Sequence, residues 1–321
     1  MRPLETTPPD PHAGHGSMTA TGGGMVDSMA QIDWAWLAAA LLLAACYLVG
    51  VGRLRRRGDR WPVGRTLSWL LGCTTIVAMT SGDLAHLGAV RLSWHMVQHM
   101  VLSMVAPLLL VAAAPITLAL RSLPTAGRLR GVRSGLMVAL HSPLGRALVH
   151  PAVAIGVFVV SLYGLYFSPL LDILMATHAG HQFMLVHFLV SGSVLFFALL
   201  AIDPTGYRNR PGVRLLLLAL TLPLHAFFGV IVMGSPMPIS AHFGAATTAL
   251  GLDPVADQHA AGGFAWAFGE IPALAATMTI FVQWLRQDRR EAARQDRRAD
   301  RNGDAEMAAY NERLAEAARQ Q

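Results

Sequence analysis

Cysteine and charged residues are both scarce in this chain, and lysine is absent altogether. The 321 residues include two cysteines, Cys46 and Cys73, which lie inside apolar stretches and form neither a CxxC pair nor a zinc-finger spacing. A disulfide framework is therefore excluded, and we expect both thiols to be packing residues. Charged residues make up 14% of the chain, against about 25% in an average soluble domain. Because the sequence also lacks a P-loop, a dinucleotide-binding fingerprint and a nucleophile–base constellation, we expect it not to be an enzyme.

Apolar sequence fills the chain in long blocks instead. Hydrophobic residues make up 54% of it, and the mean hydropathy is +0.45. Blocks of about 18 to 25 apolar residues have the length that crosses a bilayer as a helix. The sequence therefore predicts an all-α, polytopic membrane protein. The seven transmembrane helices that we expect are Asp33–Val51, Thr66–Ser81, Trp94–Leu120, Pro151–Phe167, His181–Ile202, Val213–Gly234 and Ala260–Leu285.

The basic residues, all 25 of them arginine, gather in alternate connections between these helices. They lie in the first, third and fifth connections and in the tail that begins at Arg286, whereas only Arg2 and Arg91 fall on the other side. The positive-inside rule places the arginine-rich segments in the cytoplasm, so we predict an N-terminus outside and a C-terminus inside. The net charge of +6 is explained by this topology, and no nucleic-acid partner is expected.

Composition divides the chain into three parts. Residues 1–32 lack the apolar segment of a signal peptide and predict a flexible extracytoplasmic arm. Within this arm His12, His15 and Met18 either capture copper loosely or belong to a disordered linker. Residues 33–285 form the predicted seven-helix domain. Residues 286–321 alternate arginine with acidic residues and alanine, which predicts a charged cytoplasmic helix that is either simply solvated or docks a partner.

Histidine and methionine concentrate toward the predicted outer face. His95 and His99 are four residues apart, so their imidazoles share one helical face about 6 Å apart. This separation suits two ligands of one metal ion. With the neighbouring thioethers of Met100 and Met104, the imidazoles form a soft ligand set that favours copper, especially Cu(I). The alternative is that the methionines pack against lipid or protein and that the histidines are interfacial.

Further polar candidates lie on the later spans. The fifth span opens with His178 and His181 and continues to His187, and we expect the last two to point into the bundle. His225 and Glu270 lie at similar depth in the sixth and seventh spans, Glu270 about 15 Å along its helix. Ionisable groups at membrane depth are costly, so these two are expected to pair. The pair is either a proton or ion relay or a structural hydrogen bond.

Several motifs occur in a fixed order along the chain: His95–Pro107, Ala114–Arg121, Ser161–Asp172, Pro223–Gly229, Asp257–Gly263 and Trp266–Pro272. In this order they resemble the multi-span CtaG family of cytochrome c oxidase assembly proteins, over about residues 30–310, and the last motif is similar to an actinobacterial branch. The resemblance implies a seven-span protein of the plasma membrane that assembles the haem–copper oxidase, with copper insertion at the CuB centre as its proposed role. That branch often carries a fused CopD-type copper-resistance domain, and we expect this chain to lack one. His259 stands where the family more often has glutamine, so as a ligand it is an addition.

We therefore expect copper to bind transiently at the outer face and to pass to the haem–copper catalytic subunit docked alongside. The candidate ligands are His95, His99, Met100, Met104, His181, His187 and His259. Three alternatives remain open. A copper or proton transporter needs polar residues across the whole bilayer, and few lie below His225 and Glu270. A haem-binding electron carrier would use His99 and His187, and a metal-free assembly scaffold would need neither ion nor haem. The oligomeric state is left open.

Overall fold

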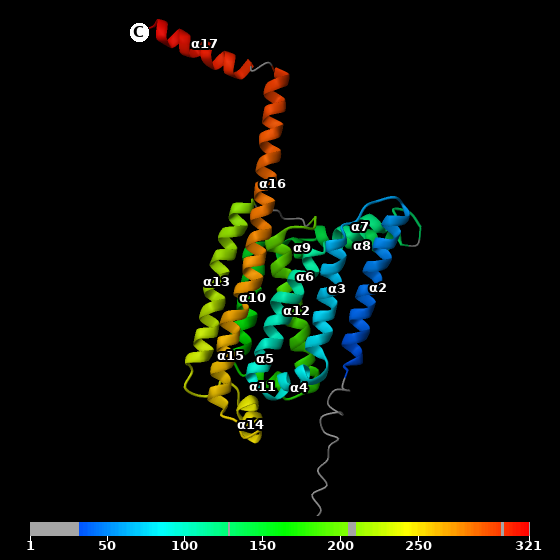
Figure 1. The fold of residues 1–321 in the computed structure, drawn as a ribbon, viewed down its shortest axis with the longest axis vertical. Coiled ribbons are helices and arrows are strands. Elements are labelled where there is room, and N and C mark those ends of the chain that lie inside the picture. Colours follow the sequence, from blue (N-terminus) through cyan, green and yellow to red (C-terminus); the bar gives the residue numbers. More distant parts are fainter. Residues whose placement is uncertain (1–31, 128, 205–209, 303–304, 321) are drawn as a thin grey trace, which may run out of the picture.

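The computed structural model describes residues 32–127, 129–204, 210–302 and 305–320, and all regular structure within these ranges is helical. The long helices run side by side in one bundle (Figure 1). They are α2 (Trp34–Arg56), α3 (Val63–Thr80), the consecutive segments of Leu92–Ser122, α10 (Pro151–Tyr166), α12 (His178–Leu200), α13 (Pro211–Gly234), α15 (Pro254–Phe268) and α16 (Glu270–Asn302). The prediction of an all-α membrane protein is confirmed at this level. The arm predicted at residues 1–32, with its histidines, lies outside the described residues except for Ile32.

Within the described residues, five helices are long and apolar enough to cross a membrane: α2, Leu92–Ser122, α12, α13 and Pro254–Asp300. Two other predicted spans correspond to α3, with 18 residues, and α10, with 16 residues. Helix α2 packs through only one side, and Cys46 is exposed on its surface, whereas Cys73 of α3 is buried. The expectation that both cysteines lie in the core is therefore wrong for Cys46.

The third long helix is segmented because it contains two prolines. Helix α5 (Leu92–Met100) continues into a π-helical turn, η1 (Val101–Val105), and then into α6 (Ala106–Ala112), which begins beside Pro107. Proline has no N–H to donate, and the wider π turn bridges the resulting gap in the hydrogen-bond ladder. Before α7 (Pro115–Ser122), Ala114 adopts a left-handed conformation with φ of 55°.

The π turn brings α12 close to the third long helix. A Cβ atom built on Gly192 of α12 would lie 1.8 Å from the carbonyl oxygen of Ser103, so only glycine permits this approach. At its other end, α12 begins where Thr177 Oγ1 accepts a hydrogen bond from the N–H of Gly180 at 3.0 Å. Such side-chain caps favour a helix start at that position. Close packing and capping together fix which residues of α12 face α5.

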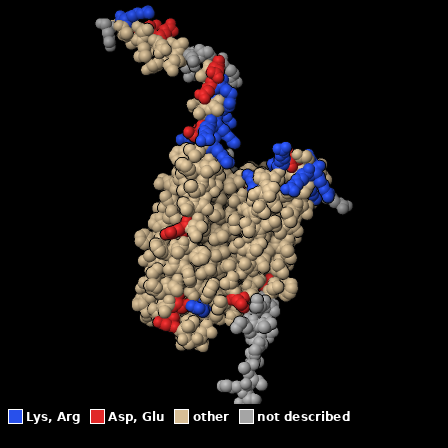
Figure 2. Space-filling model, in the orientation of Figure 1, with Lys and Arg blue, Asp and Glu red and all other residues tan. Residues whose placement is uncertain are grey.

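Short helices close both ends of the bundle. At the end where α2 and α12 begin lie α4 (Gly82–Val90), α11 (Leu170–Met175) and α14 (Ala241–Ala249), and at the other end lie α7, α8 (Arg130–His141) and α9 (Pro143–Leu148) (Figure 1). Figure 2 shows basic residues gathered at the end with α7 to α9 and along α16, with a nearly uncharged belt between the two ends. Beyond the bundle α16 runs on to Asn302, and α17 spans Ala305–Arg319.

Candidate metal centre

Three histidines from two helices meet inside the bundle near the end with α4, α11 and α14. His95 and His99 of α5 are fully buried and His181 of α12 is partly buried. One potential ligand nitrogen from each of the three lies within 4.8 Å of the others. The ring centroid of His95 lies 4.1 Å from that of His99 and 5.6 Å from that of His181. The four-residue spacing thus places two imidazoles on one face, and α12 supplies the third.

A backbone hydrogen bond selects the nitrogen that His95 presents to this group. Its Nδ1 lies 2.9 Å from the carbonyl oxygen of Gly88 in α4. A carbonyl oxygen only accepts, so Nδ1 carries the hydrogen and Nε2 keeps a free lone pair. A metal-binding histidine is commonly held in this way, through its other ring nitrogen.

Four ring nitrogens of the group are buried and have no hydrogen-bond partner in the described part of the chain. They are Nε2 of His95, both ring nitrogens of His99 and Nε2 of His181. Buried polar atoms are nearly always paired, because an unpaired one loses its hydrogen bonds to water. Because these unpaired nitrogens lie close together, the group has the geometry to accept an ion or another polar ligand.

Aromatic side chains enclose the three histidines. The ring of Phe243 lies 4.8 Å from that of His95, and the ring of Phe188 lies 4.5 Å from that of His99. Tyr166 lies 6.2 Å from both histidines by ring centroids, and its buried hydroxyl has no partner among the described residues. The ligand group contains no carboxylate. A neutral ligand set in an apolar shell favours a monovalent soft cation over a hard divalent one, because less charge is left uncompensated.

The end of α4 organises the outer side of this centre. The last carbonyls of a helix have no donor within the helix, so they accept bonds from elsewhere. Three consecutive carbonyls of α4 do so: Gly88 from His95, Ala89 from His242 Nε2 at 2.9 Å, and Val90 from Thr247 Oγ1 at 3.4 Å. Helix α14, which carries the last two donors, is thereby tied to the histidine group.

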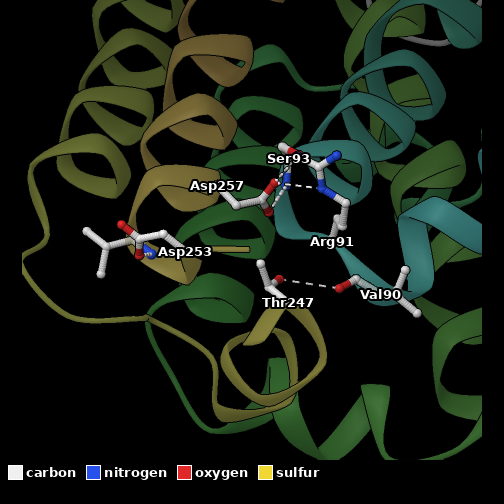
Figure 3. Close-up of polar contacts among 7 residues, drawn as sticks. Val90, Arg91, Ser93, Thr247, Asp253 and Asp257 are labelled. Atoms are coloured by element: carbon white, nitrogen blue, oxygen red, sulfur yellow. Dashed lines mark hydrogen bonds and ion pairs between the residues drawn. The ribbon is translucent and has the colours of Figure 1, made fainter. Parts of the chain in front are cut away.

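Asp257 of α15 holds the first turn of α5 through Ser93, which lies two residues before His95 (Figure 3). Its carboxylate accepts bonds from the backbone N–H of Ser93 at 3.0 Å and from the Ser93 hydroxyl at 2.6 Å. Arg91 donates to the same carboxylate through Nε at 3.0 Å and through a terminal nitrogen at 2.7 Å. Sequence reasoning missed the pairing of Arg91 with Asp257, which no spacing along the chain indicates.

The other predicted ligands are not members of the three-histidine group. Met100 places Sδ 3.2 Å from Nε2 of His225, so it is turned toward α13. Met104 packs in a separate apolar cluster, His187 is partly buried, and His259 is exposed on α15. Their roles as ligands stay predictions.

His225 and Glu270 line the same surface groove without touching. His225 is buried, whereas Glu270 is exposed at the first position of α16. Among the described residues no hydrogen bond or ion pair joins them, and Nε2 of His225 contacts Met100 instead. The groove therefore holds both groups, and the predicted pair is not in direct contact.

The sequence of this chain matches a family of known proteins. A family model described as cytochrome c oxidase caa3 assembly factor (Caa3_CtaG) matches residues 45–287. Uncharacterized proteins of Mycobacterium bovis and Mycobacterium tuberculosis are each 42% identical over 286 residues, which cover 88% of this chain and 43% of the relative. An uncharacterized protein of Mycobacterium leprae is 41% identical over 287 residues, with the same coverage. The chain thus spans less than half the length of these curated relatives. No solved structure matches it.

Proposed function

The chain belongs to the cytochrome c oxidase caa3 assembly factor family, and from this premise we propose that it carries copper as cargo to the oxidase under assembly. The cargo is Cu(I), bound transiently by the three-histidine group, and the acceptor is the CuB centre of the haem–copper catalytic subunit. The role is non-catalytic, and the membrane is the plasma membrane.

One observation carries this proposal: a potential ligand nitrogen from each of His95, His99 and His181 lies within 4.8 Å of the others, and each of these residues has a buried ring nitrogen without a partner. With metal–nitrogen bonds of about 2.0 Å, three imidazoles around one ion have nitrogens about 3.5 Å apart. Small side-chain rotations close the difference. Three neutral imidazoles suit Cu(I) and lack the thiolates that would make the site too tight for a carrier.

The proposed topology places this site toward the outside of the cell. Seven spans, with α3 and α10 added to the five longest helices, put α4, α11 and α14 at the extracytoplasmic end. The arginine-rich end with α7 to α9 is then cytoplasmic, as the positive-inside rule requires. His181, the one ligand of the three that is only partly buried, offers the entry point for copper.

Haem is a poorer fit to the same residues. The rings of Phe188 and Phe243 lie within 5 Å of His99 and His95 respectively, at 4.5 and 4.8 Å. A flat macrocycle bound through His99 or His95 would need the space beside these imidazoles that the two phenylalanine rings occupy. A transporter role has no specific support, because the histidine group lies at one end of the bundle.

The test is Cu(I) loading of detergent-purified protein, with oxidase assembly followed in cells. We expect stoichiometric copper in the wild type and its loss in His95→Ala/His99→Ala, with less oxidase assembled. The loss of affinity should exceed the about 10- to 100-fold typical of losing an outer-shell partner. His86→Ala is the matched control, because His86 is exposed on α4 at the same end. A copper-free wild type with normal oxidase in the double variant would leave only a metal-free scaffold.

A further inference from the structure

A groove on the side of the bundle holds an exposed acidic residue, Glu270, at the first position of α16. It has a volume of about 400 Å³ and lies between α13 and the junction of α15 with α16. Glu270 lies at its rim and His225 at its floor. Figure 2 shows acidic atoms midway along the bundle, in a surface otherwise nearly free of charge.

Glu270 has no partner in the part of the chain that the structure describes. It lies within Pro254–Asp300, a helix pair apolar enough to cross a membrane, and its neighbours Ile271 and Leu274 are 74% and 64% exposed. A carboxyl group in hydrocarbon loses its hydrogen bonds to water whether or not it is charged. Such residues are costly at membrane depth, and lipid tails offer no hydrogen-bond donor. The group therefore needs a donor from another molecule.

The shape of the groove suits a helix. Ala226, Gly269 and Ala273 lie along it, and small residues let helix backbones approach closely in a membrane. A Cβ atom on Gly269 would lie 2.4 Å from Nδ1 of His225, so the floor is formed directly by that imidazole. On its far side, His225 contacts Met100, the residue after His99. A helix in this groove would thus be connected to the histidine group through the contact between His225 and Met100.

We propose that this groove docks a transmembrane helix of the client oxidase subunit, one that carries a basic or hydrogen-bond-donating side chain at the level of Glu270. This inference rests on the proposed function for the identity of the client. A helix with such a side chain would complement the carboxylate of Glu270 and could approach the small residues of the groove closely. A lipid tail would do neither.

The test is site-specific photo-crosslinking in cells that assemble the oxidase. A photoreactive residue replaces Leu274 beside the groove, and the matched control replaces Leu42 of α2, which is 65% exposed on another helix. We expect the Leu274 probe, and not the Leu42 probe, to crosslink to a transmembrane segment of the catalytic subunit. Glu270→Leu should lower the yield by about 3- to 30-fold, the range for losing a polar contact between membrane helices.

A second variant addresses the groove without touching the carboxyl. Ala226→Phe fills the space from α13 and should lower the crosslink similarly. Crosslinks to lipid only, crosslinks to a second copy of this chain, or equal yields with and without Glu270 would each overturn the proposal. Cu(I) loading separates it from the proposed function: if the wild type binds no copper but crosslinks to the subunit in a Glu270-dependent way, the cargo proposal fails and the groove proposal stands.

Discussion

His181 is the residue on which the three-histidine group depends for its third nitrogen. The bond from His95 Nδ1 to the carbonyl oxygen of Gly88 orients one imidazole of the α5 pair, and α12 brings a third imidazole to this pair. His178, three residues earlier on α12, is exposed and lies 3.3 Å from Gln182. The two histidines of one helix therefore differ in access to the ion.

We predict that His181→Ala weakens Cu(I) binding, by more than the about 10- to 100-fold typical of an outer-shell change. The reason is that two nitrogens remain where three converged. His178→Ala, the matched variant one turn away, should bind copper as the wild type does. Competition with a Cu(I) chelator measures both, and equal affinities for the two variants would contradict the three-ligand site.

At the residue scale the sequence predicts the α5 pair because a helix repeats every 3.6 residues. His181 is also among the predicted ligands, but the sequence does not single it out from His187 and His259, because its place beside the pair depends on the close approach of Gly192 to Ser103. Met100 shows the limit of reasoning from adjacency. It follows His99 directly, and one residue rotates a helix by about 100°, so its thioether faces His225 on α13 instead of the neighbouring imidazoles.

Among the elements, α14 is held to α11 by one carboxylate. Asp172 accepts bonds from the Ser240 hydroxyl at 2.5 Å and from the backbone N–H groups of Ala241 and His242, each at 3.1 Å. Burial raises the pKa of Asp172, but these donors together outweigh burial and hold the pKa below its ordinary value. Since α14 also carries His242 and Phe243, this carboxylate supports the wall of the histidine group.

Acid should therefore loosen α14. A carboxyl whose pKa is lower in the folded state stabilises that state above its unfolded pKa, about 4, and this contribution is lost as the pH falls through the folded value. We predict faster hydrogen–deuterium exchange in residues 241–249 of the wild type below about pH 4, after correction for intrinsic rates. Asp172→Asn should be looser at neutral pH and show no further acid effect, while Asp83→Asn on the exposed face of α4 should behave as the wild type. Identical pH profiles for Asp172→Asn and the wild type would contradict this assignment.

Helix positions were predictable from apolar block length, whereas the devices that hold the helices were not. The π turn accommodates the missing N–H of Pro107, and the left-handed conformation of Ala114 reflects the restriction that Pro115 places on the residue before it. The form of both features depends on packing against α12. Helices α4, α11 and α14 are too short to be marked by hydropathy. The bond of Asp257 to Ser93 and Arg91 joins residues 164 or more positions apart, so only the folded chain displays it.

The whole molecule is asymmetric in charge, and this asymmetry was the part most directly predictable. Arginine is costly to bury in lipid, so arginine-rich connections stay on one side of the membrane. These connections alternate along the chain, and in the structure most of the arginines lie at one end of the bundle (Figure 2). The lateral groove was not predictable in the same way. It arises where α15 ends at Phe268 and α16 begins at Glu270, beside the proline-containing α13.

The orientation itself is the last prediction. Because arginine-rich connections are retained in the cytoplasm, α8 should face the cytoplasm and α14 the exterior. In a background with Cys46 and Cys73 replaced by alanine, Ser134→Cys on α8 and Ala249→Cys on α14 place one exposed thiol at each end. We expect a membrane-impermeant maleimide to label only the α14 thiol on intact cells stripped of wall, and both thiols after lysis. Labelling of the α8 thiol on intact cells would reverse the topology and put the histidine group on the cytoplasmic side, where an external route for copper delivery would no longer hold.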